Sequence, residues 1–208
     1  MCGGERMKRL LLIFLLLIIF GCENVQEKEY NIMAKGKRIL IVIAPRNFRD
    51  EELFIPYEYF KSRGFDVTVA STKKGEAVGM LGKRFYVNKT LDEINPKDYH
   101  AIVIVGGIGS KQYLWDNNKL INLIKEFHNQ NKIIAAICLS PAILAKAKIV
   151  NGIKVTVFPD SEAIRIIKEN NGVYEKKDLV VDKNIITASN PSVAKRFAIE
   201  IEKKIYNS

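Results

Sequence analysis

The chain has 208 residues, of which 48% are hydrophobic and 27% charged, and its formal net charge is +10. This composition fits one packed α/β domain of ordinary size with a tail. The basic residues occur as single lysines and lysine pairs, with no basic stripe interleaved with aromatic residues, so we expect no nucleic acid partner. Three cysteines, two of them in the N-terminal segment, exclude a disulfide framework.

The first 22 residues have the pattern of a targeting segment. Basic residues at positions 6, 8 and 9 precede an apolar run of eleven residues, 10–20, which is shorter than the roughly 18–20 residues that span a bilayer. Residues 19–22 resemble a lipoprotein signal box, in which Cys22 would be lipidated. We therefore assign residues 1–22 to a signal or membrane anchor, 23–36 to a polar tether and 37–208 to the domain.

Three interpretations of this segment stay open: a lipoprotein signal, an uncleaved short membrane anchor, or a start site placed too far upstream. The first two make the membrane a partner and place the domain outside the cell, tethered by the N-terminal segment. The third rests on Met33, which stands just before the domain, and would leave the protein in the cytoplasm.

Apolar runs alternate with helical patterns through the domain. Buried strands are predicted at 38–44, 66–71, 101–105 and 133–137, and shorter strands at 153–157, 179–182 and 185–188. Helices are predicted at 51–63, 116–129, 161–169 and 192–206, with a further helix beginning near Pro141. Residues 45–47 are predicted to break the first strand, and 79–87 to form a short excursion or hairpin. The alternation predicts a doubly wound, mainly parallel sheet covered by helices on both faces.

The cysteine at position 138 stands on the corner between a buried strand and a helix. Ala136 and Ser140 are small, as a tight strand-to-helix turn around Cys138 requires, which is the steric pattern of a nucleophile elbow with Cys in place of Ser. A thiol beside a helix N-terminus is favoured as thiolate. The alternative is a buried structural cysteine at a strand end.

Two further loops are expected at the same edge of the sheet, where ligands bind in such folds. Glu52 follows the first strand, close to Asp50 and Glu51, and could exchange a proton with a thiol, although acids also favour a helix N-terminus through its dipole. Gly106 and Gly107 end the third strand and could expose N–H groups to an anion or an oxyanion. Their loop lacks the spacing of a dinucleotide or phosphate loop, so we expect no cofactor.

Histidines are scarce, and neither suits a role as base. His100 precedes a strand and is therefore expected at the opposite end from Cys138, and His128 lies late in a helix. No cluster of His, Cys and carboxylate residues has metal-ligand spacing, so no metal is expected.

Three motifs resemble the ThiJ/PfpI family, which includes the Parkinsonism-associated protein and archaeal PfpI-type peptidases. They are residues 52–56 (Glu, then Pro four positions later), 105–109 (VGGIG) and 135–141 (AAICLSP), and the resemblance covers about 37–203. It implies a flavodoxin-like sandwich of the class I glutamine amidotransferase-like type, a homodimer or higher homo-oligomer, a Glu52 hydrogen bond to Cys138, and an oxyanion site at the N–H groups of Gly107 and Leu139.

The chain departs from the peptidase-like members of that family. Where they have histidine after the nucleophile, this chain has Leu139, and the positions that supply Glu or His in other members read 110–112 (SKQ) and 157–159 (VFP). Peptide hydrolysis and glutamine amidotransfer are therefore not expected.

Two functions remain as hypotheses. The first is thiol-dependent chemistry on small carbonyl compounds, or an oxidative-stress response at Cys138, as in a cysteine-dependent hydrolase or lyase of the PfpI type. The second is a non-catalytic, membrane-tethered binding or assembly module.

Overall fold

A computed structural model describes residues 34–207 of the chain. Its main element is a seven-stranded sheet in the order β11-β12-β8-β7-β1-β3-β6. The strands are β1 (Arg38–Val42), β3 (Asp66–Ser71), β6 (Lys89–Thr90), β7 (Ala101–Ile104), β8 (Ile133–Ile137), β11 (Leu179–Asp182) and β12 (Ile185–Ala188). All neighbours pair in parallel except β11, which is antiparallel to β12. This confirms the predicted α/β fold with a mainly parallel sheet.

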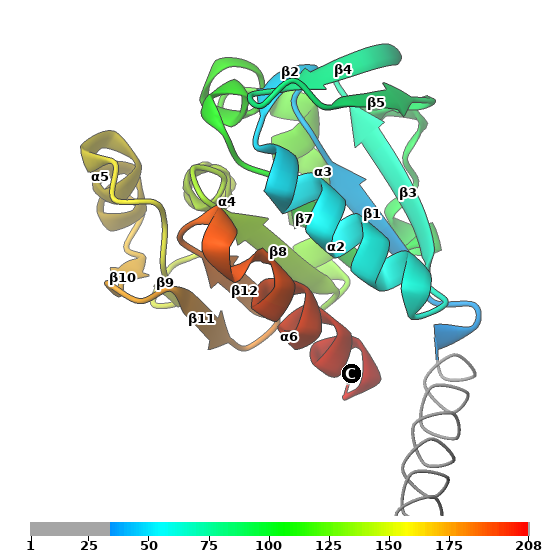
Figure 1. Cartoon of the computed structure of the whole chain (residues 1–208). Coiled ribbons are helices and arrows are strands. Elements are labelled where there is room, and N and C mark those ends of the chain that lie inside the picture. Colours follow the sequence, from blue (N-terminus) through cyan, green and yellow to red (C-terminus); the bar gives the residue numbers. More distant parts are fainter. Residues whose placement is uncertain (1–33, 208) are drawn as a thin grey trace, which may run out of the picture.

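Helices cover both faces of the sheet (Figure 1). One layer holds α2 (Asp50–Ser62) and α6 (Ala194–Tyr206), which pack on each other, and the other holds α3 (Asn118–Asn129) and α4 (Pro141–Lys146). The helix α5 (Ser161–Glu169) packs outside α4, next to a small sheet of β9 (Lys154–Val155) and β10 (Val173–Tyr174). Within residues 34–207 no helix is long and apolar enough to cross a bilayer.

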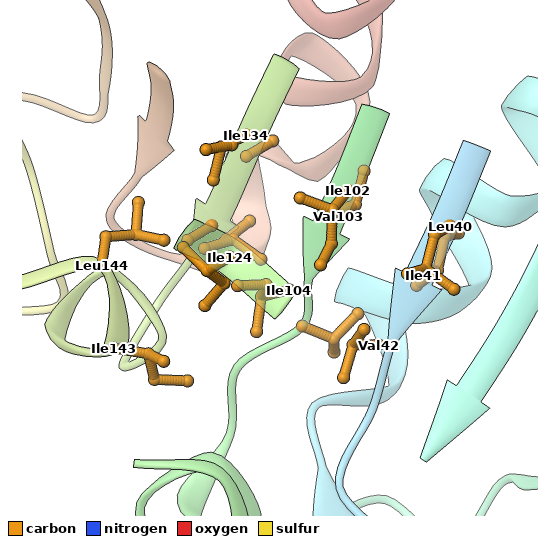
Figure 2. Packing of buried hydrophobic residues seen from close by; sticks show 14 of the residues in the cluster. Leu40, Ile41, Val42, Ile102, Val103, Ile104, Ile124, Ile134, Ile143 and Leu144 are labelled. Atoms are coloured by element: carbon orange, nitrogen blue, oxygen red, sulfur yellow. The ribbon is translucent and has the colours of Figure 1, made fainter. Parts of the chain in front are cut away.

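The core lies between these layers because the central strands are apolar on both faces. Figure 2 shows Leu40, Val42, Ile102, Ile104 and Ile134 on three adjacent strands, with side chains from α3 and α4 packed against them. All residues of β7 and β8 are buried, which explains why these strands appear in the sequence as unbroken apolar runs.

The first strand ends before residues 45–47, as predicted, but a further strand that was not predicted follows this break. Residues Arg46–Phe48 form β2, which pairs with β4 (Gly75–Gly79), and β4 pairs with β5 (Arg84–Val87) to make a second, three-stranded sheet. The predicted hairpin therefore begins at residue 75 rather than 79. The predicted strand at 153–157 is shorter, with only Lys154 and Val155 in it.

The chain reverses its direction of travel across the sheet at β1. From β1 it passes to β3 and β6 on one side, and then returns to β7 on the other side of β1. Parallel sheets bind ligands at the carboxyl ends of strands beside such a reversal. The segments that leave β1, β7 and β8 at this edge contain Glu52, Gly106 and Cys138, so the topology brings the three predicted motifs to one place.

Candidate functional site

Cys138 occupies a sharp corner at the end of β8. Its φ of +62° lies in the left-handed region, which costs a non-glycine residue about 1–2 kcal/mol. The corner is held on both sides, because the Cys138 N–H donates to the Ala188 carbonyl and the Cys138 carbonyl accepts from the Phe158 N–H, each at 2.9 Å. The backbone is thus fixed in a strained conformation that turns this residue out of the strand direction.

Hydrogen bonds behind the corner join it to the neighbouring strand. The buried Ser140 hydroxyl donates to the Val105 carbonyl at 2.8 Å and lies 2.7 Å from the hydroxyl of Ser110. The Trp115 indole N–H donates to the Leu139 carbonyl at 3.0 Å. Ser140 therefore has two roles: its small side chain fits the tight turn, as predicted, and its hydroxyl group bonds the corner to the loop after β7.

Glu52 reaches the same point from the first turn of α2. It is fully buried, and its Oε2 atom accepts the Gly106 N–H at 2.9 Å. A Cβ atom at Gly106 would lie 2.5 Å from the Cys138 Cβ and 2.7 Å from Glu52 Oε2. Glycine is thus required at 106, because the carboxyl group and the cysteine approach each other across its Cα.

The two acidic groups share one buried environment. Burial raises the pKa of Glu52 to about 8, against the lowering effects of the Gly106 hydrogen bond and of Cys138. Burial, and then the negative charge of Glu52, raise the pKa of the Cys138 thiol to about 12, whereas the N–H groups of Gly107 and Leu139 lower it. The pair therefore loses its first proton near pH 8, and this titration belongs to both groups together.

The second oxygen of Glu52 is the remaining unsatisfied atom of this pair. Within the described residues, Oε1 is buried without a hydrogen-bond partner of ordinary geometry, and the thiol beside it is a group that shifts the pKa of Glu52. A protonated Oε1 has a donor to offer, and a thiolate is an acceptor. The arrangement can accordingly hold a proton on the carboxyl group while the sulfur is charged.

The sulfur opens onto a mostly apolar pocket of about 380 Å³. Cys138 is 8% exposed, and among residues 34–207 Arg49 is the one charged side chain that lines the pocket, where it pairs with Glu51 through bonds of 2.8 and 2.9 Å. The lining residues are Arg49, Met80, Gly107, Ile108, Cys138, Leu139, Phe158 and Pro191. Such a pocket suits a small, weakly polar molecule.

The structure assigns the predicted residues unequal roles. Cys138, Glu52, Gly107 and Leu139 meet at one point, but the Gly106 N–H is directed to Glu52, so its predicted part in an oxyanion site is wrong. Asp50 is buried and accepts the N–H groups of Leu81 and Lys83 at 2.7 and 2.9 Å, so it holds the β4–β5 turn. Cys22 lies outside the described residues.

Histidine is absent from the walls of this pocket in the part of the chain described. His100 precedes β7, at the end of the sheet opposite Cys138, and His128 lies in α3. No group of three or more His, Cys, Asp or Glu side chains between residues 34 and 207 is arranged to hold a metal ion. Sequence reasoning missed the pocket residues Met80 and Pro191, because they come from distant segments that only the fold brings together, whereas Phe158 belongs to the stretch 157–159 that the family resemblance had singled out.

Fold and site define a class I glutamine amidotransferase-like α/β protein with a cysteine at the strand-to-helix elbow. The family model for the DJ-1/PfpI family matches residues 37–204, so the chain belongs to the DJ-1/PfpI family.

Similar proteins agree with this assignment. An uncharacterized protein of Methanocaldococcus jannaschii is 54% identical over 202 residues, which cover 96% of this chain and 98% of that protein. The deglycase PfpI of Pyrococcus furiosus is 31% identical over 153 residues, covering 73% of this chain and 90% of the relative. A crystal structure of a ThiJ/PfpI domain protein from Brachyspira murdochii is 34% identical with a TM-score of 0.78, covering 83% of this chain and 99% of that one.

Proposed function

We propose that this protein acts on small carbonyl compounds or their adducts through the Cys138 thiol, as a deglycase-type enzyme. The observation that carries the proposal is the approach of Glu52 and Cys138 across Gly106, in a buried site with a pKa of about 8 at the carboxyl group. The relatives support the substrate class, since one at 31% identity is named a deglycase.

The thiolate tautomer of the pair is favoured by the hydrogen-bond donors around it. A charge on the Cys138 sulfur is stabilised by two backbone N–H groups, from Gly107 and Leu139, whereas a charge on Glu52 receives one, from Gly106. Hydrogen bonds to the charged form of a group lower its pKa. The carboxyl group is the more acidic of the two, with a pKa of about 8 against about 12 for the thiol, and the reactive form that we propose is the tautomer in which the one remaining proton has passed from the sulfur to Glu52.

Addition to an aldehyde follows from this state. The Cys138 sulfur attacks the carbonyl carbon, a C–S bond forms, and the π electrons of the C=O bond move to oxygen. The new alkoxide takes the proton from Glu52, so that the product is a neutral hemithioacetal and Glu52 is left as carboxylate. With a dicarbonyl substrate, the Glu52 carboxylate then moves the proton of the hemithioacetal carbon to the neighbouring carbonyl carbon, which converts the adduct into a thioester. Water hydrolyses the thioester, so that a 2-hydroxy acid leaves and the Cys138 thiol is restored.

The same geometry disfavours peptide hydrolysis. An amine leaving group needs a proton from a group that can reach it, and histidine is the usual donor. Leu139 and Phe158 occupy the pocket wall, and Glu52, buried behind the sulfur, has already given up its proton to the alkoxide. An aldehyde has no leaving group at this stage, so the carbonyl reaction does not meet this obstacle.

Purified protein and methylglyoxal, a small dicarbonyl, provide the test. Loss of the dicarbonyl and a transient mass increase on Cys138 are expected, and Cys138→Ser should abolish both. Cys22→Ser is the matched control, since it also removes one thiol but belongs to the N-terminal segment and not to the domain sequence. Equal turnover by Cys138→Ser and the parent protein would refute the proposal.

The alternative is a non-catalytic module held at the membrane by the N-terminal segment. The apolar run at 10–20 favours it, as does a pocket to which the described part of the chain contributes no histidine. It predicts that Cys138→Ser leaves the biological role intact, and that peroxide or dicarbonyl reacts with Cys138 no faster than with free cysteine. A homo-oligomer, implied by the family, is checked separately by light scattering in solution.

A further inference from the structure

A second feature lies at the edge of the sheet opposite Cys138, where the strands begin. Backbone hydrogen bonds join the segments just before β3, β1, β7, β8 and β12 into one row. The Asp66 N–H donates to the Lys37 carbonyl at 3.0 Å, and the His100 N–H donates to the Arg38 carbonyl at 2.8 Å. In the same way, the Ile133 N–H donates to the His100 carbonyl at 3.2 Å and the Ile134 N–H to the Asn184 carbonyl at 2.9 Å. Because neighbouring strands lie about 4.8 Å apart, these segments make one narrow, continuous surface.

This surface, which we call the basic edge, carries an excess of positive charge. Six basic residues stand against three acids, which gives 6 − 3 = +3 at the strand beginnings. Two of the acids are already engaged, since Asp98 lies 3.5 Å from Arg38 and Asp182 accepts the Lys154 N–H at 2.8 Å. The basic residues are Lys35, Lys37, Arg38, Lys97, Lys132 and Lys183, and the acids are Asp66, Asp98 and Asp182.

Helix dipoles do not account for these lysines. Basic residues in the last turns of α2 and α6 are stabilised by the helix C-terminus, but strand beginnings have no comparable dipole. Lys35, Lys97 and Lys183 are exposed and form no ion pair with any other residue of the described range. Their charge is available to a partner.

A pocket of about 400 Å³ opens within the basic edge. Its wall includes Lys97, His100 and Lys132, together with Tyr99, Asn131 and Ile133. Burial lowers the pKa of His100, and the charges of Lys37 and Lys132 lower it further, as expected where cations crowd together. A pocket of this size and sign fits an anionic headgroup.

The N-terminal segment reaches the domain at the same edge. The Ala34 carbonyl accepts the Lys37 N–H at 2.9 Å, and Figure 1 shows this end of the described chain beside the beginnings of β1 and β3. Between Cys22 and Ala34 lie eleven residues, which reach roughly 40 Å at full extension. A domain of this length has a diameter of about 40 Å, so a chain anchored at Cys22 keeps the basic edge within about one domain diameter of the membrane.

Most of the N-terminal segment falls within the alignment with a relative. The alignment with the M. jannaschii protein covers 96% of this chain, or about 200 of 208 residues, so at most about eight residues lie outside it. Most of residues 1–33 must therefore be aligned with that protein at an overall identity of 54%.

From this placement we propose that the basic edge is a docking surface for the anionic headgroups of the membrane that holds the N-terminal segment. Docking would orient the domain with the Cys138 pocket directed away from the bilayer, since that pocket lies at the other end of the strands. The proposal rests on the membrane assignment of residues 1–22 and does not depend on the chemistry of Cys138.

The test is vesicle binding by residues 34–208 alone, because the N-terminal segment would itself bind vesicles and hide the contribution of the basic edge. This part is expected to fold alone, since the Brachyspira murdochii chain, covered to 99% by the match, has the same fold. Binding is measured by co-sedimentation with phosphatidylcholine vesicles, with and without one third phosphatidylglycerol. The test variant is a triple substitution on the basic edge: Lys35→Glu, Lys97→Glu and Lys183→Glu.

A second triple variant controls for net charge. It makes the same change of charge with three exposed lysines near the carboxyl ends of the strands: Lys73→Glu, Lys89→Glu and Lys176→Glu. Circular dichroism and melting verify that both variants fold. Any variant that melts early is replaced by the corresponding Lys→Gln set, which alters the charge by half as much.

We expect residues 34–208 to bind only the vesicles that contain phosphatidylglycerol, and to lose this binding at high salt. The affinity should fall at least tenfold in the test variant and less than twofold in the control variant. Equal weakening by both variants would show a general effect of net charge and overturn the proposal. Equal binding to vesicles with and without phosphatidylglycerol would also overturn it. So would binding to a short RNA duplex that is as tight as vesicle binding and is weakened by the test variant.

Discussion

Replacing Glu52 by glutamine should remove a large pH dependence of stability. The carboxyl group has a pKa of about 8 in the folded protein and 4.5 as a reference for the unfolded chain, because burial disfavours its charged form. The folded state thus holds a proton that the unfolded state releases between these values. Stability is fully present below pH 4.5, falls as pH rises and is lowest above pH 8.

The magnitude follows from the size of the shift. A difference of about 8 − 4.5 = 3.5 in pKa corresponds to up to about 5 kcal/mol at about 1.4 kcal/mol for each unit. Glutamine can accept the Gly106 N–H and offer its own N–H toward the sulfur, as protonated Glu52 does, but it cannot become charged. We expect Glu52→Gln to match the parent protein at about pH 5 and to exceed its unfolding free energy by several kcal/mol above about pH 8.

Urea denaturation at a series of pH values measures this difference directly. The control is Glu51→Gln, which removes a neighbouring carboxyl group that pairs with Arg49 at the surface of the site. It should keep the slope of the parent protein. Parallel stability curves for Glu52→Gln and the parent between about pH 5 and 8.5 would show that the buried carboxyl group does not carry the shift.

Three other substitutions have clear expected outcomes. Gly106→Ala would place a Cβ 2.5 Å from the Cys138 Cβ, so thermal unfolding should show a loss of about 3 kcal/mol or more, with loss of thiol reactivity. Ser140→Ala removes the bond of 2.8 Å to the Val105 carbonyl and should cost about 1–2 kcal/mol in urea denaturation. Glu202→Ala leaves the half-buried Arg63 without the carboxylate bound at 2.9 Å between α2 and α6, and should cost about 3 kcal/mol, whereas an unchanged midpoint would contradict the importance of this pair.

Much of the fold could be predicted because its central strands, such as β7 and β8, are buried on both faces and its outer elements keep short apolar runs. The runs 66–71, 133–137, 179–182 and 185–188 coincide with β3, β8, β11 and β12, and the helix at 161–169 coincides with α5. These segments show their period within a short window of sequence. Their agreement reflects local pattern and burial acting in the same direction.

The errors fall where pairing with a distant segment decides the structure. Arg46–Phe48 forms a strand because β4 lies beside it, and no pattern within three residues can show that. Residues Ser110–Leu114 form a π-helical turn before α3, whereas the apolar spacing indicated only the helix that follows. The two segments lie against each other beside the glycine loop after β7, and the Asn47 side chain donates to Gln112 at 3.3 Å.

The site itself was predictable in its parts but not in its bonding. Glu52, Cys138 and the glycine pair could be placed at one sheet edge from their position after strands. The Gly106 N–H donates to Glu52, whereas the N–H groups of Gly107 and Leu139 interact with the sulfur. This division depends on the direction of single N–H groups, which the sequence does not reveal. Asp50 likewise looked like a helix-terminal acid, whereas its carboxylate holds the N–H groups of Leu81 and Lys83.

The most direct test of the shared proton is to measure how fast Cys138 is alkylated at a series of pH values. With Cys2 and Cys22 replaced by serine, iodoacetamide reports on Cys138 alone, and Cys138→Ser supplies the blank. The thiolate should appear in a step near pH 8, the first titration of the coupled pair. A rate that stays flat through pH 8 and rises only near pH 12 would show that the carboxyl group alone loses the first proton, and would contradict this account.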